Sequence, residues 1–307
     1  MADVLVHKPV LLEEVLENLI TDKSGTYLDA TVGYGGHSLG ILNRLNPEGK
    51  LIGTDRDQEA LSVAKKNLEE FGDRVVLAQV SFSQLEDFLR QQNISQISGF
   101  LFDIGMGSWQ IETEERGFSY LKPGPLDMRM DRKQSLTAYD IVNRYSEEKL
   151  VWIFKNYGEE RFAKKIAKAL KNTKSEIRTT SDLRKMVEKV VRTNVIKTLA
   201  RVFQALRIEV NQELEELKKG IETAVKFLNP QGRLAIISYH SLEDRIVKES
   251  FRELAKGCKC PPTLPVCICG AKPELEILNK KPIVATEKEK KLNPKSRSAK
   301  LRVGVKI

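Results

Sequence analysis

The sequence predicts an α/β fold in which a doubly wound parallel sheet carries a helical insertion. Short apolar runs alternate with helix-like segments over roughly the first hundred residues, and a further apolar run lies at 232–239 after a long helical region. Such alternation favours parallel strands joined by crossover helices. With 307 residues the chain can bury a real core, as one large or two modest domains.

The alternation supplies the element boundaries. Strands are predicted at 26–31, 50–54, 74–80 and 98–103, and helices fit between them at 37–46, 57–71 and 83–92. After a loop rich in glycine and proline, apolar residues spaced three and four apart predict helices over roughly 137–227. Weaker strands are predicted at 282–286 and 300–306. We therefore expect a sheet domain of 1–110 with 222–307, and a mainly helical domain of 111–221 for substrate recognition, inserted between the fourth and fifth strands.

A glycine-rich turn after the first strand predicts a nucleotide-type cofactor. The turn runs from Gly33 to Ser38, and the second strand ends at Asp55 about twenty residues later. Backbone N–H groups at a helix start bind anions, and an acid at the second strand tip accepts hydrogen bonds from a ribose diol. Taken alone, such glycines are commonly only a turn. Ser38 matches the dinucleotide pattern loosely, and Asp29 stands where methyltransferases often carry an acid, which favours S-adenosylmethionine over a nicotinamide.

The positive charge is concentrated in two segments. Residues 161–207 contain 14 Lys/Arg against 3 Asp/Glu, and residues 280–307 contain 10 against 2, in a chain of net charge +9. Two such segments are typical of a polyanion-binding protein, although each alone is also explained by a solvated helix face or tail. The sequence has no apolar run long enough for a membrane span and no export signal at its start, so we expect a cytoplasmic protein without a membrane partner.

Two residues after predicted strands are candidates for chemistry. Asp103 follows the fourth strand, where a carboxylate could accept a hydrogen bond from a substrate amine. The alternative is a helix N-cap or turn residue. His240 follows the fifth strand and could accept a proton or make a structural hydrogen bond. Ser241 and Asp244 have the spacing of a capping box.

All four cysteines of the chain, Cys258, Cys260, Cys267 and Cys269, fall within twelve residues. In a reducing compartment such a cluster favours zinc over disulfides, and the zinc would be structural because all four positions are filled. The spacing is C-x-C rather than the usual C-x₂-C, so reduced thiols in a stabilised loop remain the alternative. The histidines at His7 and His37 are too scattered to suggest a metal triad.

Seven stretches distributed over nearly the whole chain resemble the bacterial 16S rRNA (cytosine-N4) methyltransferases. They are 7–15, 29–38, 124–131, 157–163, 203–211, 238–245 and 293–302. The resemblance implies a Rossmann-like class I methyltransferase fold with a helical insertion and S-adenosylmethionine as cofactor. It also implies a cytosine in the decoding region of the small ribosomal subunit as substrate. The partner would then be 16S rRNA in the small subunit, and the oligomeric state stays open, a homodimer included.

The resemblance also implies roles for individual residues. Gly35, Gly36 and His37 would hold the methionine end of the cofactor, Asp55 its ribose and Phe82 its adenine, while Asp103 and Gln110 would complete the site. Apart from the resemblance, the chemistry of the reaction makes Asp103 our candidate to hold the cytosine amine and His240 our candidate to accept its proton. The cytosine must leave its stack, and Trp109, Phe118 or Tyr239 could stack on it.

Other functions fit the sequence less well. A DNA amino-methyltransferase usually carries a D/N/S-P-P-Y/F turn after the fourth strand, whereas this chain has Asp103-Ile-Gly-Met106. A non-catalytic RNA-binding assembly factor could retain the fold, but it would have no reason to keep a cofactor site. A nicotinamide oxidoreductase has the least support.

Overall fold

The computed structural model describes residues 9–258, 260, 266 and 268–307, and the chain forms two compact units. The first consists of the chain up to Gly105 together with Leu214–Ile307, and the second of Met106–Glu213. The boundaries thus fall at 105 and 213, where the sequence placed them at 110 and 221. At the second boundary Gln212 takes a left-handed conformation (φ 50°), which ends one helix before the next begins.

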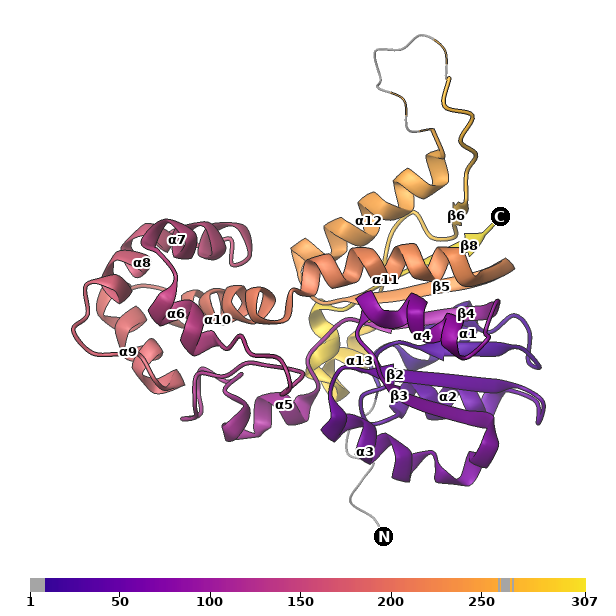
Figure 1. Ribbon diagram of the computed structural model, residues 1–307, viewed down its shortest axis with the longest axis horizontal. Coiled ribbons are helices and arrows are strands. Elements are labelled where there is room, and N and C mark those ends of the chain that lie inside the picture. Colours follow the sequence, from indigo (N-terminus) through magenta and orange to yellow (C-terminus); the bar gives the residue numbers. More distant parts are fainter. Residues whose placement is uncertain (1–8, 259, 261–265, 267) are drawn as a thin grey trace. The chain divides into compact units, whose positions relative to one another are not determined.

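The first unit is built on one twisted, mainly parallel sheet (Figure 1). Its strands are β1 (Thr26–Asp29), β2 (Lys50–Asp55), β3 (Val75–Gln79), β4 (Ile97–Asp103), β5 (Leu228–Ser238), β6 (Leu275–Ile277), β7 (Ile283–Val284) and β8 (Lys300–Lys306). The strand order is β3-β2-β1-β4-β5-β8-β6, with β7 paired to β8. Strands β1 to β5 are parallel, and β8 runs antiparallel to β5 and β6. The predicted strands are confirmed, and only β6 was missed.

Helices cover both faces of this sheet. They are α1 (Leu12–Leu19), α2 (Gly36–Arg44), α3 (Gln58–Asn67), α4 (Leu85–Gln91), α11 (Glu213–Phe227), α12 (Ser241–Lys256) and α13 (Glu287–Leu292), with the 3₁₀ turns η1 (Glu69–Arg74), η2 (Phe82–Gln84) and η4 (Pro294–Ser298). Alternate residues of a strand enter different apolar clusters: Tyr27 packs with α1 to α3, and Leu28 with α4, α11 and α12. This period of two is what a sheet buried on both faces requires. The doubly wound α/β class predicted from the sequence is confirmed.

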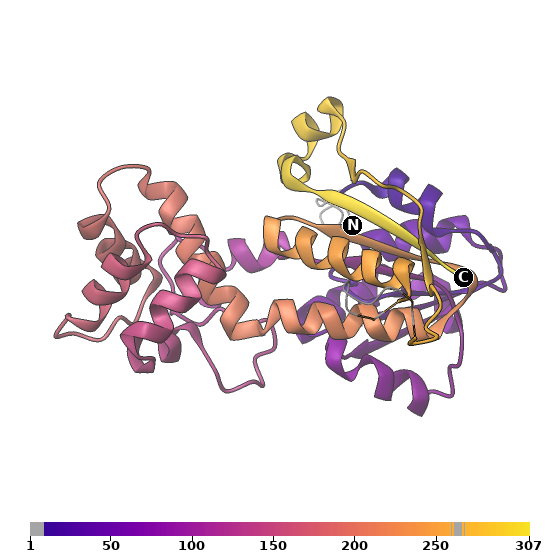
Figure 2. The same cartoon turned by 90° about the horizontal axis from the view of Figure 1, so that it is seen from above.

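The second unit is a helical bundle with its own apolar core (Figure 2). Its helices are α5 (Ser108–Glu112), α6 (Ala138–Arg144), α7 (Glu147–Asn156), α8 (Ala163–Lys171), α9 (Thr180–Val190) and α10 (Val195–Asn211), with the 3₁₀ turn η3 (Glu114–Arg116). The predicted helical region is therefore confirmed. In the described residues no helix is both long and apolar enough to cross a membrane.

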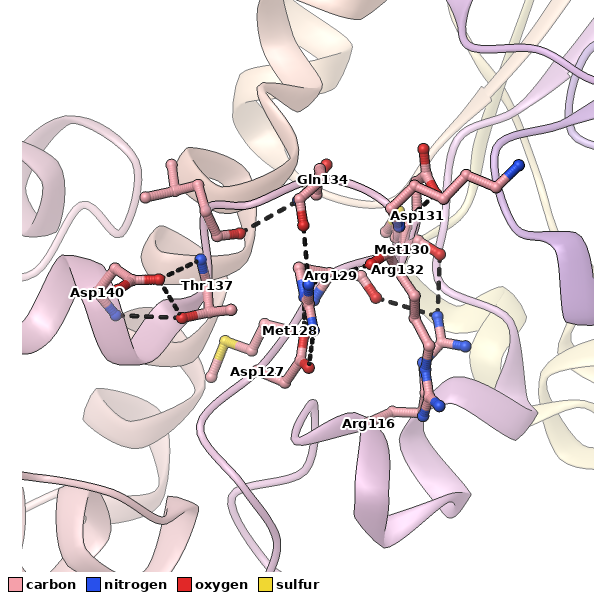
Figure 3. A network of polar contacts seen from close by, with 12 residues as sticks. Arg116, Asp127, Met128, Arg129, Met130, Asp131, Arg132, Gln134, Thr137 and Asp140 are labelled. Atoms are coloured by element: carbon pink, nitrogen blue, oxygen red, sulfur yellow. Dashed lines mark hydrogen bonds and ion pairs between the residues drawn. The ribbon is translucent and has the colours of Figure 1, made fainter.

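Polar contacts order the glycine- and proline-rich loop that leads into this bundle (Figure 3). The buried Arg116 guanidinium donates hydrogen bonds to the backbone carbonyls of Arg129 and Met130, each at 3.0 Å. Asp127 accepts two hydrogen bonds from the Arg129 guanidinium, at 2.8 Å on each carboxylate oxygen. The Asn211 side chain of α10 bonds the backbone on either side of this turn, at Met130 N–H and Met128 C=O. The loop is thereby fixed against α10 without a large apolar core of its own.

Candidate functional site

Three carboxylates stand at the ends of three neighbouring strands. Asp29 ends β1, Asp55 ends β2 and Asp103 ends β4, and the sheet places these strands side by side in the order β2-β1-β4. Because the strands are parallel, their carboxyl ends lie at one edge of the sheet. Ligands of open α/β sheets bind outside that edge. The acids that the sequence singled out are therefore gathered in one region of the first unit.

Asp29 holds the glycine turn that follows β1. Its Oδ2 accepts a hydrogen bond from the Ser38 hydroxyl at 2.7 Å, and its Oδ1 accepts one from the Thr31 N–H at 3.1 Å. Burial raises the pKa of Asp29, while His37 and Ser38 act in the opposite direction. Gly35, the residue before α2, has φ 89°, a left-handed value that favours glycine. The turn thus leads directly from the strand end into the start of α2.

The Asp55 carboxylate is fixed by two backbone donors. Gly33 N–H donates to Oδ2 and Asp57 N–H to Oδ1, both at 2.9 Å. The first of these bonds connects the end of β2 with the glycine turn after β1. Burial raises the pKa of Asp55 to about 6, although both hydrogen bonds act in the opposite direction. Each oxygen has used one lone pair, so the carboxylate can still accept hydrogen bonds from a diol.

The Asp103 carboxylate is oriented by side chains that come from elsewhere in the sheet unit. Its Oδ1 accepts a hydrogen bond from the Tyr239 hydroxyl at 2.7 Å, and its backbone N–H donates to the Thr31 hydroxyl at 2.7 Å. Its Oδ2 lies 3.6 Å from Nδ1 of His37. Burial raises the pKa of Asp103 and raises that of Tyr239 well above its ordinary value. The N-cap alternative is wrong, because α5 begins only after Gly107.

The His37 ring lies between the Val10 carbonyl and the Asp103 carboxylate. Nε2 of His37 lies 2.9 Å from the carbonyl oxygen of Val10, which can only accept a hydrogen bond, so Nε2 carries a hydrogen. Nδ1 then faces Asp103 Oδ2 at 3.6 Å. The contact with Val10 thus fixes the orientation of the ring beside the carboxylate at the end of β4.

His240 caps α12. Its Nδ1 accepts a hydrogen bond from the Glu243 N–H at 3.4 Å, and Glu243 Oε2 accepts one from the His240 N–H at 3.2 Å. Nε2 of His240 also lies 3.0 Å from Glu243 Oε1. The capping box therefore begins one residue earlier than the sequence predicted. That prediction was wrong because Asp244 instead accepts hydrogen bonds from Lys300 and Arg302 of β8.

Phe82 follows β3 and begins η2. Its ring meets that of Phe102 on β4 edge-on, with centroids 5.0 Å apart. A side chain on Gly220 of α11 would come within 3.1 Å of Phe82. The Phe82 ring is therefore held firmly between β4 and α11, within the same unit as the three acids.

Gln110 and the remaining aromatic candidates belong to the second unit. Gln110 Oε1 accepts a hydrogen bond from the Gly107 N–H at 3.1 Å at the start of α5. The Arg116 guanidinium lies over the ring of Trp109, 4.9 Å from its centroid. Phe118 is buried in the core of this unit, so the prediction that it can stack on a base is wrong.

Sequence reasoning missed the hydroxyl groups that support the acids. Thr31 contacts Asp103 and was not singled out, and Ser38 contacts Asp29 but was considered only as a small residue of the glycine turn. Tyr239 was considered only as a stacking ring, whereas its hydroxyl binds Asp103. The available signal was the position of all three residues in the stretches just after strands β1 and β5. His7 and Cys267 lie outside the described residues.

The two basic segments differ in how far the fold uses them. Exposed basic residues of the first segment are Arg161, Lys164, Lys165, Lys168, Lys174, Arg178, Lys185, Lys189, Arg192 and Lys197. In the second segment Lys295 and Arg297 are exposed, whereas Lys300 and Arg302 bond Asp244. These bonds lower the pKa of Asp244, although its burial alone would raise it. Part of the tail is thus structural.

The strand order, the glycine turn and the acids at the ends of β1 and β2 define a methyltransferase of Rossmann-like fold that uses S-adenosylmethionine. The chain belongs to the MraW methylase family, whose profile matches residues 4–307. It is 46% identical over 306 residues to ribosomal RNA small subunit methyltransferase H of Clostridium botulinum strain Loch Maree, covering 98% of this chain and 99% of the relative. The enzyme of the same name from Caldicellulosiruptor saccharolyticus is 47% identical over 308 residues, with the same coverage.

Proposed function

We propose that this methyltransferase modifies N4 of a cytosine in the decoding region of 16S ribosomal RNA. The names of the relatives support a small-subunit rRNA substrate. The resemblance of the sequence motifs supports the cytosine and its region. The observation on which the chemistry rests is the Asp103 carboxylate at the end of β4, oriented by Tyr239. A fixed hydrogen-bond acceptor is what an exocyclic amine needs in order to be positioned.

The residues around the glycine turn fit the cofactor. Gly35, Gly36 and His37 would hold its methionine end at the start of α2, and Asp55 its ribose hydroxyls. Phe82 would flank the adenine. Asp103 would complete the part of the site that the first unit provides. When bound, S-adenosylmethionine supplies an electrophilic methyl group, and the protein's part is to bring the amine to it in line.

Asp103 would act on the substrate amine in two ways. The lone pair of N4 is delocalised into the cytosine ring, and a hydrogen bond from N4–H to Asp103 localises it on nitrogen. Because burial raises the pKa of Asp103, the carboxylate accepts a proton more readily than an exposed one. The proton released by N4 can therefore pass to Asp103. His37 lies beside the same carboxylate, with its Nδ1 3.6 Å from Asp103 Oδ2.

His240→Asn separates capping from proton transfer at this position. Asparagine is a strong N-cap, so we expect a wild-type melting temperature and methyl transfer within about tenfold of wild type. Loss of a general base costs about 10²–10⁴-fold. Turnover assays and thermal melts of the wild type and of His240→Asn measure the rate of methyl transfer and the melting temperature. A loss beyond a hundredfold at unchanged melting temperature would show that His240 accepts the proton.

The exposed lysines of α8 would contact the RNA backbone. For the variant Lys164→Gln with Lys165→Gln we expect weaker RNA binding and a salt slope of the binding constant reduced by about 1–2, because each phosphate contact contributes about 0.7–0.9. The matched control changes the adjacent exposed pair Lys65 and Lys66 of α3 to glutamine. RNA titrations at several salt concentrations measure the salt slope of both variants. Equal slopes in the two variants would rule out a specific role for α8.

The proposal as a whole is tested with labelled S-adenosylmethionine and unmodified small-subunit particles. We expect one labelled cytosine, located by mass spectrometry of RNA fragments, and no label on duplex DNA. A labelled DNA base would identify a DNA amino-methyltransferase. Cofactor binding without transfer to any RNA would indicate a binding factor.

A further inference from the structure

The described residues between α12 and β6 project from the sheet unit (Figure 1), and the two ends of this segment meet at a neck. Glu274 N–H donates a hydrogen bond to the carbonyl of Leu254 at 2.9 Å, which joins the two ends. Gly257 lies in the neck with φ 68°, and a Cβ there would come within 2.3 Å of the backbone of Lys272. The two arms of the segment are therefore in direct backbone contact where they leave the fold.

Just beyond this neck three thiols come together. Sγ of Cys258 and Sγ of Cys269 are 3.9 Å apart, although the residues are eleven positions apart in the sequence. Cys260 joins them, and the three sulfur atoms all lie within 4.8 Å of one another. A disulfide needs an S–S distance of about 2.05 Å, so Cys258 and Cys269 are separate thiols.

We propose that Cys258, Cys260 and Cys269 bind a zinc ion that holds this segment closed. Tetrahedral zinc with Zn–S bonds of about 2.3 Å places neighbouring sulfur atoms about 3.8 Å apart, which matches the 3.9 Å separation of Cys258 and Cys269. Thiolates select soft metals such as zinc over magnesium or calcium. The thiols lose their protons to the solvent as the metal binds.

Among the described residues of the segment, apolar burial does not supply a constraint of this kind. Its described large aliphatic side chains, Val266 and Ile268, are 70% and 79% exposed. A metal that joins both arms removes conformational freedom from the connecting chain, as any cross-link does. The zinc lies outside the cluster of acids at the strand ends, and its role is structural. The fourth cysteine of the sequence, Cys267, is outside the described residues, and the proposal does not depend on it.

The test measures metal in the full-length protein, purified with a reductant and without added chelator. We expect about one zinc per chain in the wild type, and a large loss of zinc in Cys258→Ser and in Cys269→Ser. The matched control is Ile268→Ser, a change at an exposed position in the same segment, which should keep its zinc. Cobalt in place of zinc should give the visible and near-ultraviolet bands of tetrahedral thiolate coordination. Unchanged circular dichroism shows that each variant is folded.

A second measurement tests the structural role. Removing zinc with a chelator should speed tryptic cleavage between Lys256 and Lys272, and restoring zinc should reverse this. A reduced wild-type protein without metal would overturn the proposal, as would zinc content equal in all variants. A protein mass that shows a disulfide under the same reducing conditions would overturn it as well.

Discussion

Replacing Asp103 by asparagine is expected to lower the rate of methyl transfer by about 10²–10⁴-fold while the protein stays folded. The amide keeps the size of the side chain and can still accept the Tyr239 hydrogen bond. It removes the negative charge that would localise the N4 lone pair and accept its proton. Single-turnover rates with small-subunit particles measure the loss. Calorimetry with S-adenosylmethionine checks that cofactor affinity changes by less than tenfold.

Tyr239→Phe is the matched variant for this experiment. It removes only the hydroxyl that orients Asp103, so we expect a smaller loss of about tenfold in the rate and little change in cofactor affinity. The variant should also shift the pH–rate profile to higher pH, because the Tyr239 hydrogen bond lowers the pKa of Asp103. Wild-type turnover in Asp103→Asn would refute the role of this carboxylate.

Cofactor binding is expected to weaken as the pH falls through 6, because the Asp55 that we propose as the ribose acceptor accepts hydrogen bonds more strongly when it is ionised. The pKa of Asp55 in the free folded protein is about 6, and ribose donors would lower it in the complex. Binding therefore releases a proton, and affinity should fall by about tenfold per pH unit below 6. In the free protein the folding stability depends on pH in the opposite direction to the cofactor affinity. A pKa raised from 3.8 means that stability declines as the pH rises from about 4 to about 6.

Asp55→Asn should remove this pH dependence. At pH 7.5 we expect about 10–100-fold weaker binding, from the loss of hydrogen bonds to a charged acceptor. Adenosine, which has the ribose but not the methionine, isolates this effect from Asp29 and Asp103, whose pKa values are also raised. Titration calorimetry between pH 5 and pH 7.5 measures the affinities for S-adenosylmethionine and for adenosine. A wild-type pH profile in Asp55→Asn would exclude Asp55 as the ribose acceptor.

The sheet could be predicted because its strands are continuous apolar runs separated by helices of ordinary length. β6 could not, since Leu275–Ile277 is three residues long and its pairing with β8 is decided by tertiary contacts. The sequence also could not show which residue is the N-cap of α12. Glu243 and Asp244 both offer a carboxylate near the helix start, and the choice depends on Lys300 and Arg302, far away in the chain.

The grouping of the three acids at one edge of the sheet was predictable from their position, because they follow parallel strands. Their partners were not. Tyr239 and Asp103 are 136 residues apart, and no local pattern links them. The contact between His37 and the carbonyl of Val10 is likewise formed only when α2 packs beside α1.

The position of β8 has a consequence for the order in which the chain can fold. Its strand Lys300–Lys306 lies between β5 and β6, although it follows both in the sequence. While the chain is being synthesised, one edge of β5 must therefore stay unpaired until β8 emerges from the ribosome. Exposed strand edges recruit other chains. Nascent copies of this protein should accordingly be most prone to aggregate just before Lys300–Lys306 becomes available.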